Sequence, residues 1–226
     1  MAIPLLETIG IEGKTISADA LLTQRRLARY LVEDRRAHYH FTAKGNQPRL
    51  LEDLTLYFQD RQEPHAVTVD SDHGRIETRK IWVTAELNTY LDFPHVGQAF
   101  VVERERIDKK SREVSTETVY GITSRTPDQA DAEHVLKTNR NHWCIENSCH
   151  YIIDWNYDED RSRIRTGHGP ENITRLRRFA VGLIKSKGVV SVAQKMRMLA
   201  MNPRAVLDYL RMTDNTRSRR SATGAE

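Results

Sequence analysis

The first forty residues change between strand-like and helix-like patterns of apolar positions within a short stretch of chain. Residues 15–18 indicate a short strand that ends near Asp19. A helix follows up to about Arg35, with Thr23 as its expected cap, and the aromatic residues 38–43 indicate a second strand. Because strand, helix and strand follow one another so closely, we expect a βαβ unit with two parallel strands.

The next segment is dominated by strands. After a turn cluster and a short helix, apolar and alternating runs predict four strands, at residues 66–69, 75–85, 99–107 and 114–123. Residues 108–111 have the composition of a hairpin turn between the last two of these strands. We therefore expect a mostly antiparallel β module that is inserted after the βαβ unit.

Helical spacing returns after Pro127. The periodicity predicts helices over residues 128–151, 170–185, 189–199 and 203–212. The tail that follows is small, polar and basic, and we expect it to be disordered. The predicted fold class is therefore α/β, and the predicted segments are residues 1–62, the β-rich residues 63–125, the helical residues 126–212 and the tail 213–226.

Composition and cysteine usage narrow the class of protein. Of the 226 residues, 38% are hydrophobic and 29% are charged, which is typical of a globular protein in water. No apolar run approaches the roughly 20 residues that a membrane helix needs, and the N-terminus lacks the basic and apolar regions of a secretory signal. The cysteines are Cys144 and Cys149, so we expect a cytoplasmic protein without a disulfide scaffold.

Positive charge is concentrated in one segment of the chain. The formal net charge is +4, but residues 161–197 contain ten Lys or Arg and one acid, Glu171, so this segment carries +9 and the remainder −5. A basic block beside an acidic remainder favours binding to a polyanion. The alternative interpretation is an ordinary solvated helix face.

Two carboxylates stand in positions that suit a metal site. Asp19 follows a strand that we expect to be parallel, and α/β proteins place ligands at that edge of the sheet. His142, Glu146 and His150 are spaced four residues apart on one predicted helix face, which Asp154 extends. A carboxylate at a strand end and another on a helix can together hold the hard divalent cations used in phosphodiester chemistry.

Other interpretations exist for the same residues. Asp19 alone fits an aspartate at a helix N-terminus, and Glu146 fits a surface glutamate. A rival use of the helix face is a zinc site formed by His142, Glu146 and His150, although the spacing differs from the His-Glu-x-x-His pattern. That site would make the protein a small metal-dependent hydrolase.

Four motifs resemble, in order, those of one transposase family. The string HWCIEN at residues 142–147, followed by His150, Asp154 and residues 159–165, resembles the C-terminal signature of bacterial insertion-sequence transposases. The group it resembles is the H-repeat-associated transposase family, which has a DDE-type catalytic centre on a ribonuclease-H-like fold. The upstream matches are GKTISADA at residues 13–20 with Gln24 after it, KGNQ at 44–47 and HGRIETR at 73–79. The resemblance covers residues 1 to about 200.

The resemblance implies a role for both carboxylates. Asp19 matches the second catalytic aspartate and Glu146 the catalytic glutamate, which with a third carboxylate would hold two Mg²⁺ (or Mn²⁺) ions. A wider group of transposases has Tyr-x2-Arg-x3-Glu-x6-Lys around that glutamate, and this chain shares only the glutamate, with Asn139, His142 and Ile153 at the other places. The implied fold is a partial ribonuclease-H-like core over residues 1–62, interrupted by the β-rich insertion.

The resemblance also implies that a part of the family's site is missing. The first catalytic aspartate of the family lies upstream of the Asp19 block, and we expect its place to precede Met1. The chain would then be the C-terminal portion of a transposase, inactive alone, with weak or absent metal binding. The strand before Asp19 would keep an unpaired edge, and Leu27 and Leu31 would be uncovered, which favours self-association or pairing with the missing segment.

The partner implied by the family is double-stranded DNA at transposon ends, and no membrane contact is expected. Basic side chains would bind phosphates with little sequence preference. The candidates are Lys44, His142, Arg161, Arg163, Arg165, Arg175, Arg177 and Arg178. Lys44 fits a solvated turn lysine equally well. An alternative function for the whole chain is a non-catalytic DNA-binding regulator derived from a transposase.

Overall fold

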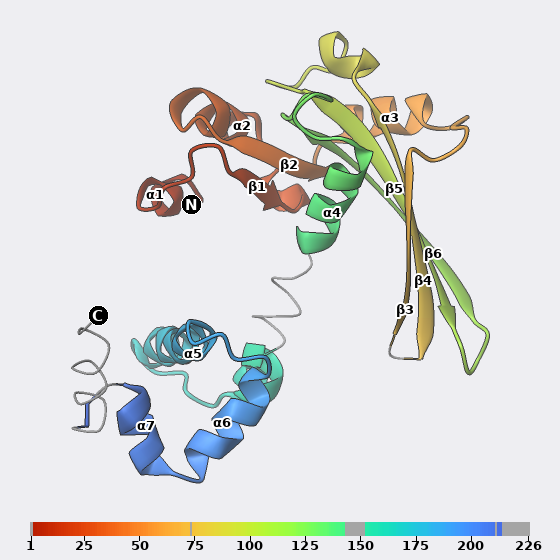
Figure 1. Ribbon diagram of the computed structural model, residues 1–226. Helices are drawn as coiled ribbons and strands as arrows, with labels where there is room; N and C mark the ends of the chain where they lie inside the picture. Colours follow the sequence, from red (N-terminus) through yellow and green to blue (C-terminus); the bar gives the residue numbers. More distant parts are fainter. Residues whose placement is uncertain (1, 73, 143–151, 211, 214–226) are drawn as a thin grey trace, which may run out of the picture. The chain divides into compact units, whose positions relative to one another are not determined.

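The chain forms two compact units, Met1–Trp143 and Cys144–Glu226, and each is considered by itself. A computed structural model describes residues 2–72, 74–142, 152–210 and 212–213 (Figure 1). The predicted helix over 128–151 is described only as far as residue 142, and the predicted disorder of the tail concerns residues that are almost all outside the described part of the chain.

The first unit is built on one six-stranded sheet with the order β1-β2-β6-β5-β4-β3. Its strands are β1 (Thr15–Ala18), β2 (His38–Ala43), β3 (Ala66–Asp72), β4 (Arg75–Thr84), β5 (Gln98–Asp108) and β6 (Val114–Thr123). The parallel pairing of β1 with β2 confirms the predicted βαβ unit, and the remaining pairs are antiparallel. The antiparallel strands continue the same sheet, because β6 pairs with β2 and places Ile122 opposite Phe41.

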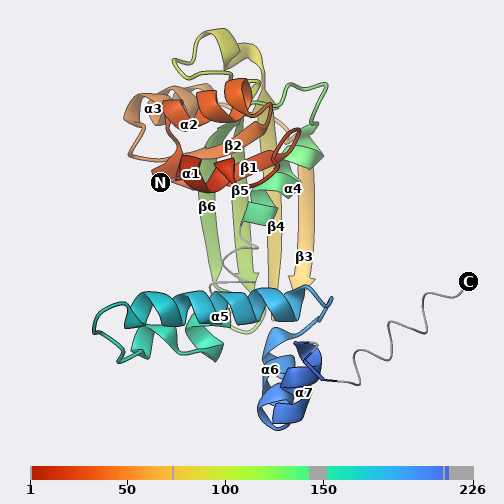
Figure 2. The same ribbon diagram turned by 90° about the vertical axis from the view of Figure 1, so that its left-hand side faces the viewer.

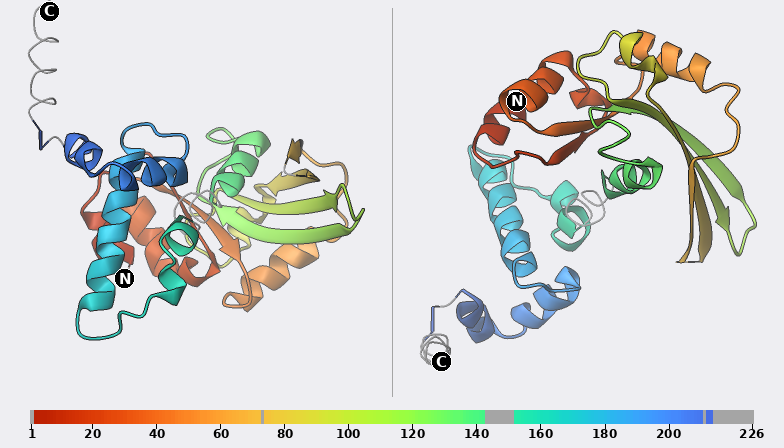
Figure 3. Two further views of the ribbon diagram at one scale, coloured as in Figure 1. Left: turned by 90° about the horizontal axis from the view of Figure 1, so that it is seen from below. Right: turned by 45° about the horizontal axis from the view of Figure 1, so that its top comes forward.

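Helices lie on both faces of this sheet. One face is covered by α1 (Ala2–Glu7), α2 (Arg25–Arg29), the π-helical turn η2 (Tyr30–Asp34), α3 (Pro48–Tyr57) and the 3-10 turn η3 (Glu86–Thr89). The 3-10 turn η1 (Ala20–Leu22) connects the end of β1 to α2 and has no buried residue. The other face is the inner side of the curved sheet, and α4 (Ala132–His142) lies against it (Figure 3). There α4 contacts β1 at one edge of the sheet and β3 at the other.

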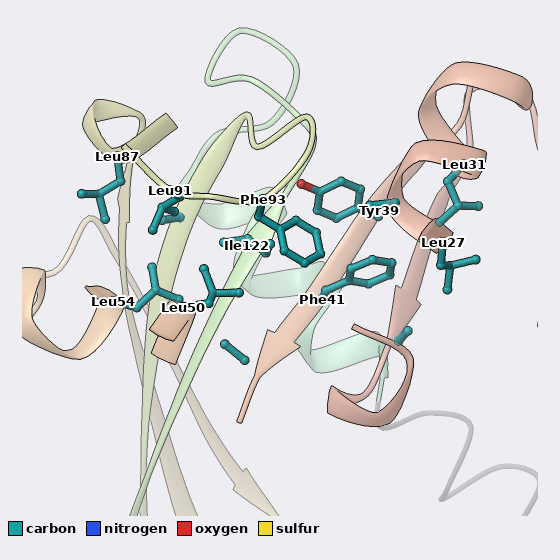
Figure 4. Close-up of a cluster of buried hydrophobic side chains, with 14 of the residues drawn as sticks. Leu27, Leu31, Tyr39, Phe41, Leu50, Leu54, Leu87, Leu91, Phe93 and Ile122 are labelled. Atoms are coloured by element: carbon teal, nitrogen blue, oxygen red, sulfur yellow. The ribbon is translucent and has the colours of Figure 1, made fainter. Parts of the chain in front are cut away.

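The larger core lies between the sheet and the helices α2 and α3 (Figure 4). Tyr39 and Phe41 are two residues apart on β2 and share a face, and their rings stack with centroids 4.6 Å apart. Phe93 meets the Tyr39 ring edge-on at 6.0 Å. Aromatic side chains bury large apolar areas, and these three rings form one contiguous group within the core.

The expectation that Leu27 and Leu31 would be uncovered is wrong. Both are buried in the larger core, in the same cluster as Tyr39 and Phe41 of β2, and Figure 4 shows them on the helical segment that covers β2. The cause is the N-terminal segment, which supplies Leu6 and Ile11 to the same cluster. Arg35 fixes this segment by donating a hydrogen bond of 2.8 Å to the carbonyl oxygen of Leu6.

A smaller core lies beneath α4. Phe100 and Val102 of β5 face α4, and they pack with Ile81 of β4 and with Val135 and Leu136 of the helix. Figures 1 and 2 show the strands β3 to β6 continuing well past the β1–β2 pair as a long arm. Along this arm the residues on the α4 side change from apolar to charged.

The second unit is helical. It contains the π turn η5 (Ile152–Asn156), the 3-10 turn η6 (Glu159–Arg161), α5 (Gly169–Lys185), α6 (Val192–Ala200) and α7 (Pro203–Tyr209), which confirms the three predicted C-terminal helices with shorter bounds for α6 and α7. Its buried apolar side chains are Ile153, Val181, Ile184 and Val192. Every helix in the described part of the chain is too short or too polar to cross a lipid bilayer.

Candidate active site

Asp19 lies where β1 ends, beside a parallel neighbour strand. Its backbone is extended, with φ −72° and ψ 176°, and it occupies the N-cap position of η1 without a capping hydrogen bond from its side chain. The backbone is nevertheless fixed, because the Asp19 carbonyl accepts a hydrogen bond of 3.1 Å from the Leu22 amide, and the Thr23 hydroxyl lies 3.2 Å from the same oxygen. The exposed carboxylate is thus held at the edge where ligands of α/β sheets bind, and capping does not explain it.

The turn after β2 supports the segment after Asp19. Thr23 is buried, and its hydroxyl donates to the Thr42 carbonyl at 2.7 Å; Gln24, rather than the predicted Thr23, occupies the N-cap of α2. Asn46 donates to the Ala20 carbonyl, and Gln47 donates to the Thr23 carbonyl at 2.9 Å. The KGNQ motif therefore acts as a brace between the ends of the two parallel strands.

Lys44 begins this brace. It is exposed directly after β2, and the brace bonds to the residues that follow Asp19. Lys44 thus lies at the same end of the parallel pair as Asp19.

The C-terminal turn of α4 meets β1 just before Asp19. Asp131 starts the helix by accepting a bond of 2.8 Å from the His134 amide. At the other end, Nδ1 of the half-buried His142 lies 3.2 Å from the Ser17 hydroxyl. His142 is the last described residue of the predicted catalytic helix. Its contact with Ser17 fixes it beside β1, two residues before Asp19, the predicted catalytic aspartate.

Glu146 lies outside the described residues, as do Cys144, Cys149 and His150. The predicted proximity of Asp19 and Glu146 therefore stays a prediction, and so does the rival zinc site, of which only His142 is described. Among the residues that the structure describes, no group of three or more His, Cys, Asp or Glu side chains is placed to hold a metal ion.

The Asp19 carboxylate suits the hard divalent cations that the resemblance implies, Mg²⁺ or Mn²⁺. Asp19 offers a carboxylate that is exposed and not used for capping, and carboxylate oxygens together with water are the ligands of Mg²⁺ and Mn²⁺. Asp19 fits such an ion as one ligand of a set, and Glu146 is the sequence candidate for a second.

The predicted DNA-binding arginines of the second unit differ in their surroundings. Arg163, Arg165 and Arg178 are exposed. Arg161 is exposed and pairs with Asp158 at 3.5 Å, and Arg175 pairs with Glu171 at 2.5 Å on the surface of α5. Surface pairs of this kind are weak, so the guanidinium groups of Arg161 and Arg175 can leave their carboxylate partners for another anion.

Arg177 is the exception. Its side chain is only 16% exposed, and it pairs with Glu159, 3.7 Å away and also largely buried. The Thr174 hydroxyl donates to the same carboxylate. This arginine therefore links α5 to η6, and a contact with DNA would require that link to break.

A buried polar pair between α4 and β2 was not foreseen from the sequence. His40 is 2% exposed, and its ring stacks on Phe100 with centroids 4.5 Å apart. Asn139 is also buried, and its Nδ2 lies 3.5 Å from Nε2 of His40. Burial, together with the nearby His142 and His134, lowers the pKa of His40 to about 3. His40 is therefore neutral at physiological pH. The available signal was a histidine at an inward position of a strand, next to Tyr39 and Phe41.

The HGRIETR motif resembles a motif of the transposase family, and the fold shows the structural role of its charged residues. Glu77 is buried among arginines: it pairs with Arg79, and its carboxylate lies 3.9 Å from Arg104 and 3.8 Å from Arg106. Arg79 also binds Asp70 at 2.9 Å, and Asp70 in turn binds Arg140 of α4 at 2.9 Å. The motif thus connects the arm to the predicted catalytic helix.

Known proteins match most of the chain. Residues 1–181 match the family described as "Transposase DDE domain". Identity is 29% over 218 residues to "Putative transposase YncI" of Escherichia coli O157:H7, with 89% of this chain and 54% of that protein covered. The chain is also 29% identical over 220 residues to "H repeat-associated putative transposase YhhI" of Escherichia coli strain K12, and this match covers 89% of this chain and 56% of that protein. An "Uncharacterized protein in dhlA 3'region" of Xanthobacter autotrophicus is 37% identical over 135 residues, covering 56% and 45%. The chain spans about half the length of these relatives.

Proposed function

Because the chain belongs to the transposase DDE domain family, we propose that it forms part of a metal-dependent DNA transposase that acts on an insertion sequence. Asp19 and Glu146 are proposed as two of its metal-binding carboxylates. The observation that carries the proposal is the exposed Asp19 carboxylate at the end of a parallel strand, in a chain whose residues 1–181 match the family.

The first unit fixes the end of the helix that precedes Glu146 in the sequence. The end of α4 is fixed at Ser17 through His142, and Glu146 follows four residues later in the sequence. We also propose a ribonuclease-H-like core, in which the end of β1 supplies the aspartate and the sequence after α4 supplies the glutamate.

The residues of the proposed site would have three separate roles: metal binding, support of the backbone and binding of DNA phosphates. Asp19 and Glu146 would hold Mg²⁺ or Mn²⁺, which as a Lewis acid activates the attacking oxygen and stabilises the leaving oxygen in phosphodiester chemistry. The KGNQ brace keeps the backbone after Asp19 in place, so the carboxylate is preorganised. Lys44 and the exposed arginines at 161, 163, 165, 175 and 178 would bind DNA phosphates. Such a reaction on bacterial DNA would take place in the cytoplasm.

Self-association belongs to the same proposal. Within the described sheet, β1 pairs only with β2 and is an edge strand. An unpaired edge is a template for another strand, so we infer that β1 accepts a strand from a second copy or from another segment of the transposase.

Manganese binding by the purified chain tests the proposed metal site. Asp19→Asn and Glu146→Gln should each weaken Mn²⁺ binding, measured by titration calorimetry, by at least the roughly tenfold expected when a residue that merely supports a metal ligand is removed. Asp34→Asn removes an exposed carboxylate from the end of η2 and should leave the affinity unchanged.

Two outcomes would count against the proposal. Equal affinities in all three variants would remove Asp19 and Glu146 from any metal site. Retained DNA binding together with no Mn²⁺ binding by the parent chain would favour the alternative, a non-catalytic DNA-binding regulator.

A further inference from the structure

The strand β3 forms the outer edge of the arm. Within the described sheet it pairs with β4 alone, and Figure 2 shows it as the outermost strand of the arm. An edge strand presents a row of backbone N–H and C=O groups that can pair with another strand, and many proteins place lysine or proline there to prevent this. The sequence of β3, AVTVDSD, contains neither residue.

The face of β3 that is turned away from α4 is apolar and exposed. Asp70 faces α4, because it binds Arg140 of that helix, so alternation along the strand puts Val67 and Val69 on the other face. These two side chains are 49% and 65% exposed. β-branched side chains pack well against a neighbour on an adjacent strand. Two exposed valines on a sheet edge therefore suit contact with a second strand.

The face of β3 that is turned toward α4 carries two polar groups with unused bonding capacity. In the part of the chain that the structure describes, the Thr68 hydroxyl oxygen is buried without a hydrogen-bond partner, which is unfavourable. Rotation about χ1 can redirect this hydroxyl. Asp70 binds both Arg79 and Arg140 through one carboxylate oxygen, Oδ2. Among the described residues, its Oδ1 remains available as an acceptor.

The helix α4 forms a wall beside this edge. A cavity of about 620 Å³ lies between the helix and β3, and its lining includes Thr68, Lys137 and Arg140. Lys137 is exposed and makes no ion pair with a described residue. The acids of the lining, Asp131 and Glu133, lie at the other end of α4 from Arg140. A strand added to β3 would therefore meet positive charge beside the later turns of the helix.

We propose that the edge of β3 binds the β3 strand of a second copy of this chain, antiparallel and with Val69 opposite Val69 of the second copy. In that register Thr68 lies opposite Asp70 of the second copy, so its hydroxyl gains a carboxylate acceptor. The same carboxylate then lies beside Lys137. The two-fold axis makes each contact twice and closes the interface. This edge is at the opposite side of the sheet from β1, and the inference does not depend on the proposed metal site.

Sedimentation equilibrium of the full chain tests the interface. Val67→Lys combined with Val69→Lys places like charges opposite one another, so the dissociation constant of the dimer should rise by roughly tenfold or more. Both side chains are exposed, so circular dichroism should match that of the parent. Val114→Lys is the matched control, because Val114 is an exposed valine of β6, away from the sheet edge, and it should leave the dissociation constant unchanged.

A second pair of variants tests the charge beside the edge. Lys137→Glu would place an acid beside Asp70 of the second copy, so the dimer should weaken several-fold. Lys110→Glu makes the same change in the exposed turn between β5 and β6 and should have no effect. Equal dissociation constants in these two variants would remove α4 from the interface.

A cross-link tests the register. On a background with Cys144→Ser and Cys149→Ser, Val69→Cys should form a disulfide between two chains under mild oxidation. Residues directly opposite in an antiparallel pair have Cα atoms about 4.5–5.5 Å apart, which suits a disulfide. Val114→Cys should not link.

Three results would count against the inference. A parent chain that remains monomeric would overturn it. A dimer that the two lysines leave intact would also overturn it and would point to β1 as the interface. A dimer in which Val69→Cys does not link would refute the register.

Discussion

At the scale of single residues, Gly121 is the position in β6 with the least room for a side chain. A Cβ there would lie 2.3 Å from the Phe100 ring and 2.5 Å from the Phe41 carbonyl oxygen. Gly121→Ala should therefore lower the free energy of unfolding by about 1–3 kcal/mol, the usual cost of overpacking a core, as measured by urea denaturation. Gly45→Ala is the control, because nothing lies within 4 Å of its added Cβ. Equal stability of the two variants would contradict the packing at Gly121.

The sequence allowed some of these residues to be predicted and not others. The position of Asp19 at the end of a parallel strand was predictable because the strand pattern stops there, and its role as a ligand stays a prediction. His40 was not, because alternation along β2 shows which side chains share a face but not that α4 covers that face. Thr23 was assigned to a helix cap from its residue type, and the partner that it actually has, the Thr42 carbonyl, is distant in sequence.

At the scale of elements, the arm depends on the charge of Glu77. Glu77→Gln removes the anion that faces Arg79, Arg104 and Arg106. We expect the free energy of unfolding to fall by about 2 kcal/mol, which is less than the roughly 3–5 kcal/mol for a fully buried pair, because Arg104 and Arg106 remain partly accessible to solvent. Denaturant unfolding measures the change. Glu105→Gln, one residue from Arg104 and Arg106 in β5, is the matched control, and a destabilisation as large as that of Glu77→Gln would argue against the network.

Strand prediction succeeded because β-branched and alternating residues mark the four strands of the arm directly. The pairing of these strands with the βαβ unit was not predictable. An alternation of apolar and polar residues shows which side chains share a face of the strand, but it does not show which other strand lies beside it. The covering of Leu27 and Leu31 was missed for a related reason. Residues 2–7 form a helix too short to give a clear periodic signal, yet Leu6 closes that end of the core.

At the scale of the whole molecule, the basic second unit should govern the salt dependence of DNA binding. Arg161, Arg163 and Arg165 are all exposed. Changing the three together to Ala should reduce the slope of log affinity against log salt by about 0.9 for each phosphate that is no longer neutralised, as measured by fluorescence anisotropy with duplex DNA. A matched triple of exposed arginines from the first unit, Arg26, Arg29 and Arg49, should change the slope less. A slope that responds only to the second triple would move the DNA surface to the first unit.

The pairing of β2 with β6 has a consequence for the order in which the first unit folds. The hairpins β3–β4 and β5–β6 join neighbouring segments and can form early, whereas Phe41 and Ile122 come together from distant parts of the chain. Chain entropy has to be given up before such a non-local pairing forms, and β1 has no partner in the described sheet other than β2. The strand that presents Asp19 is therefore expected to join the sheet late, so a nascent chain would acquire the proposed metal-binding edge only after the arm is already folded.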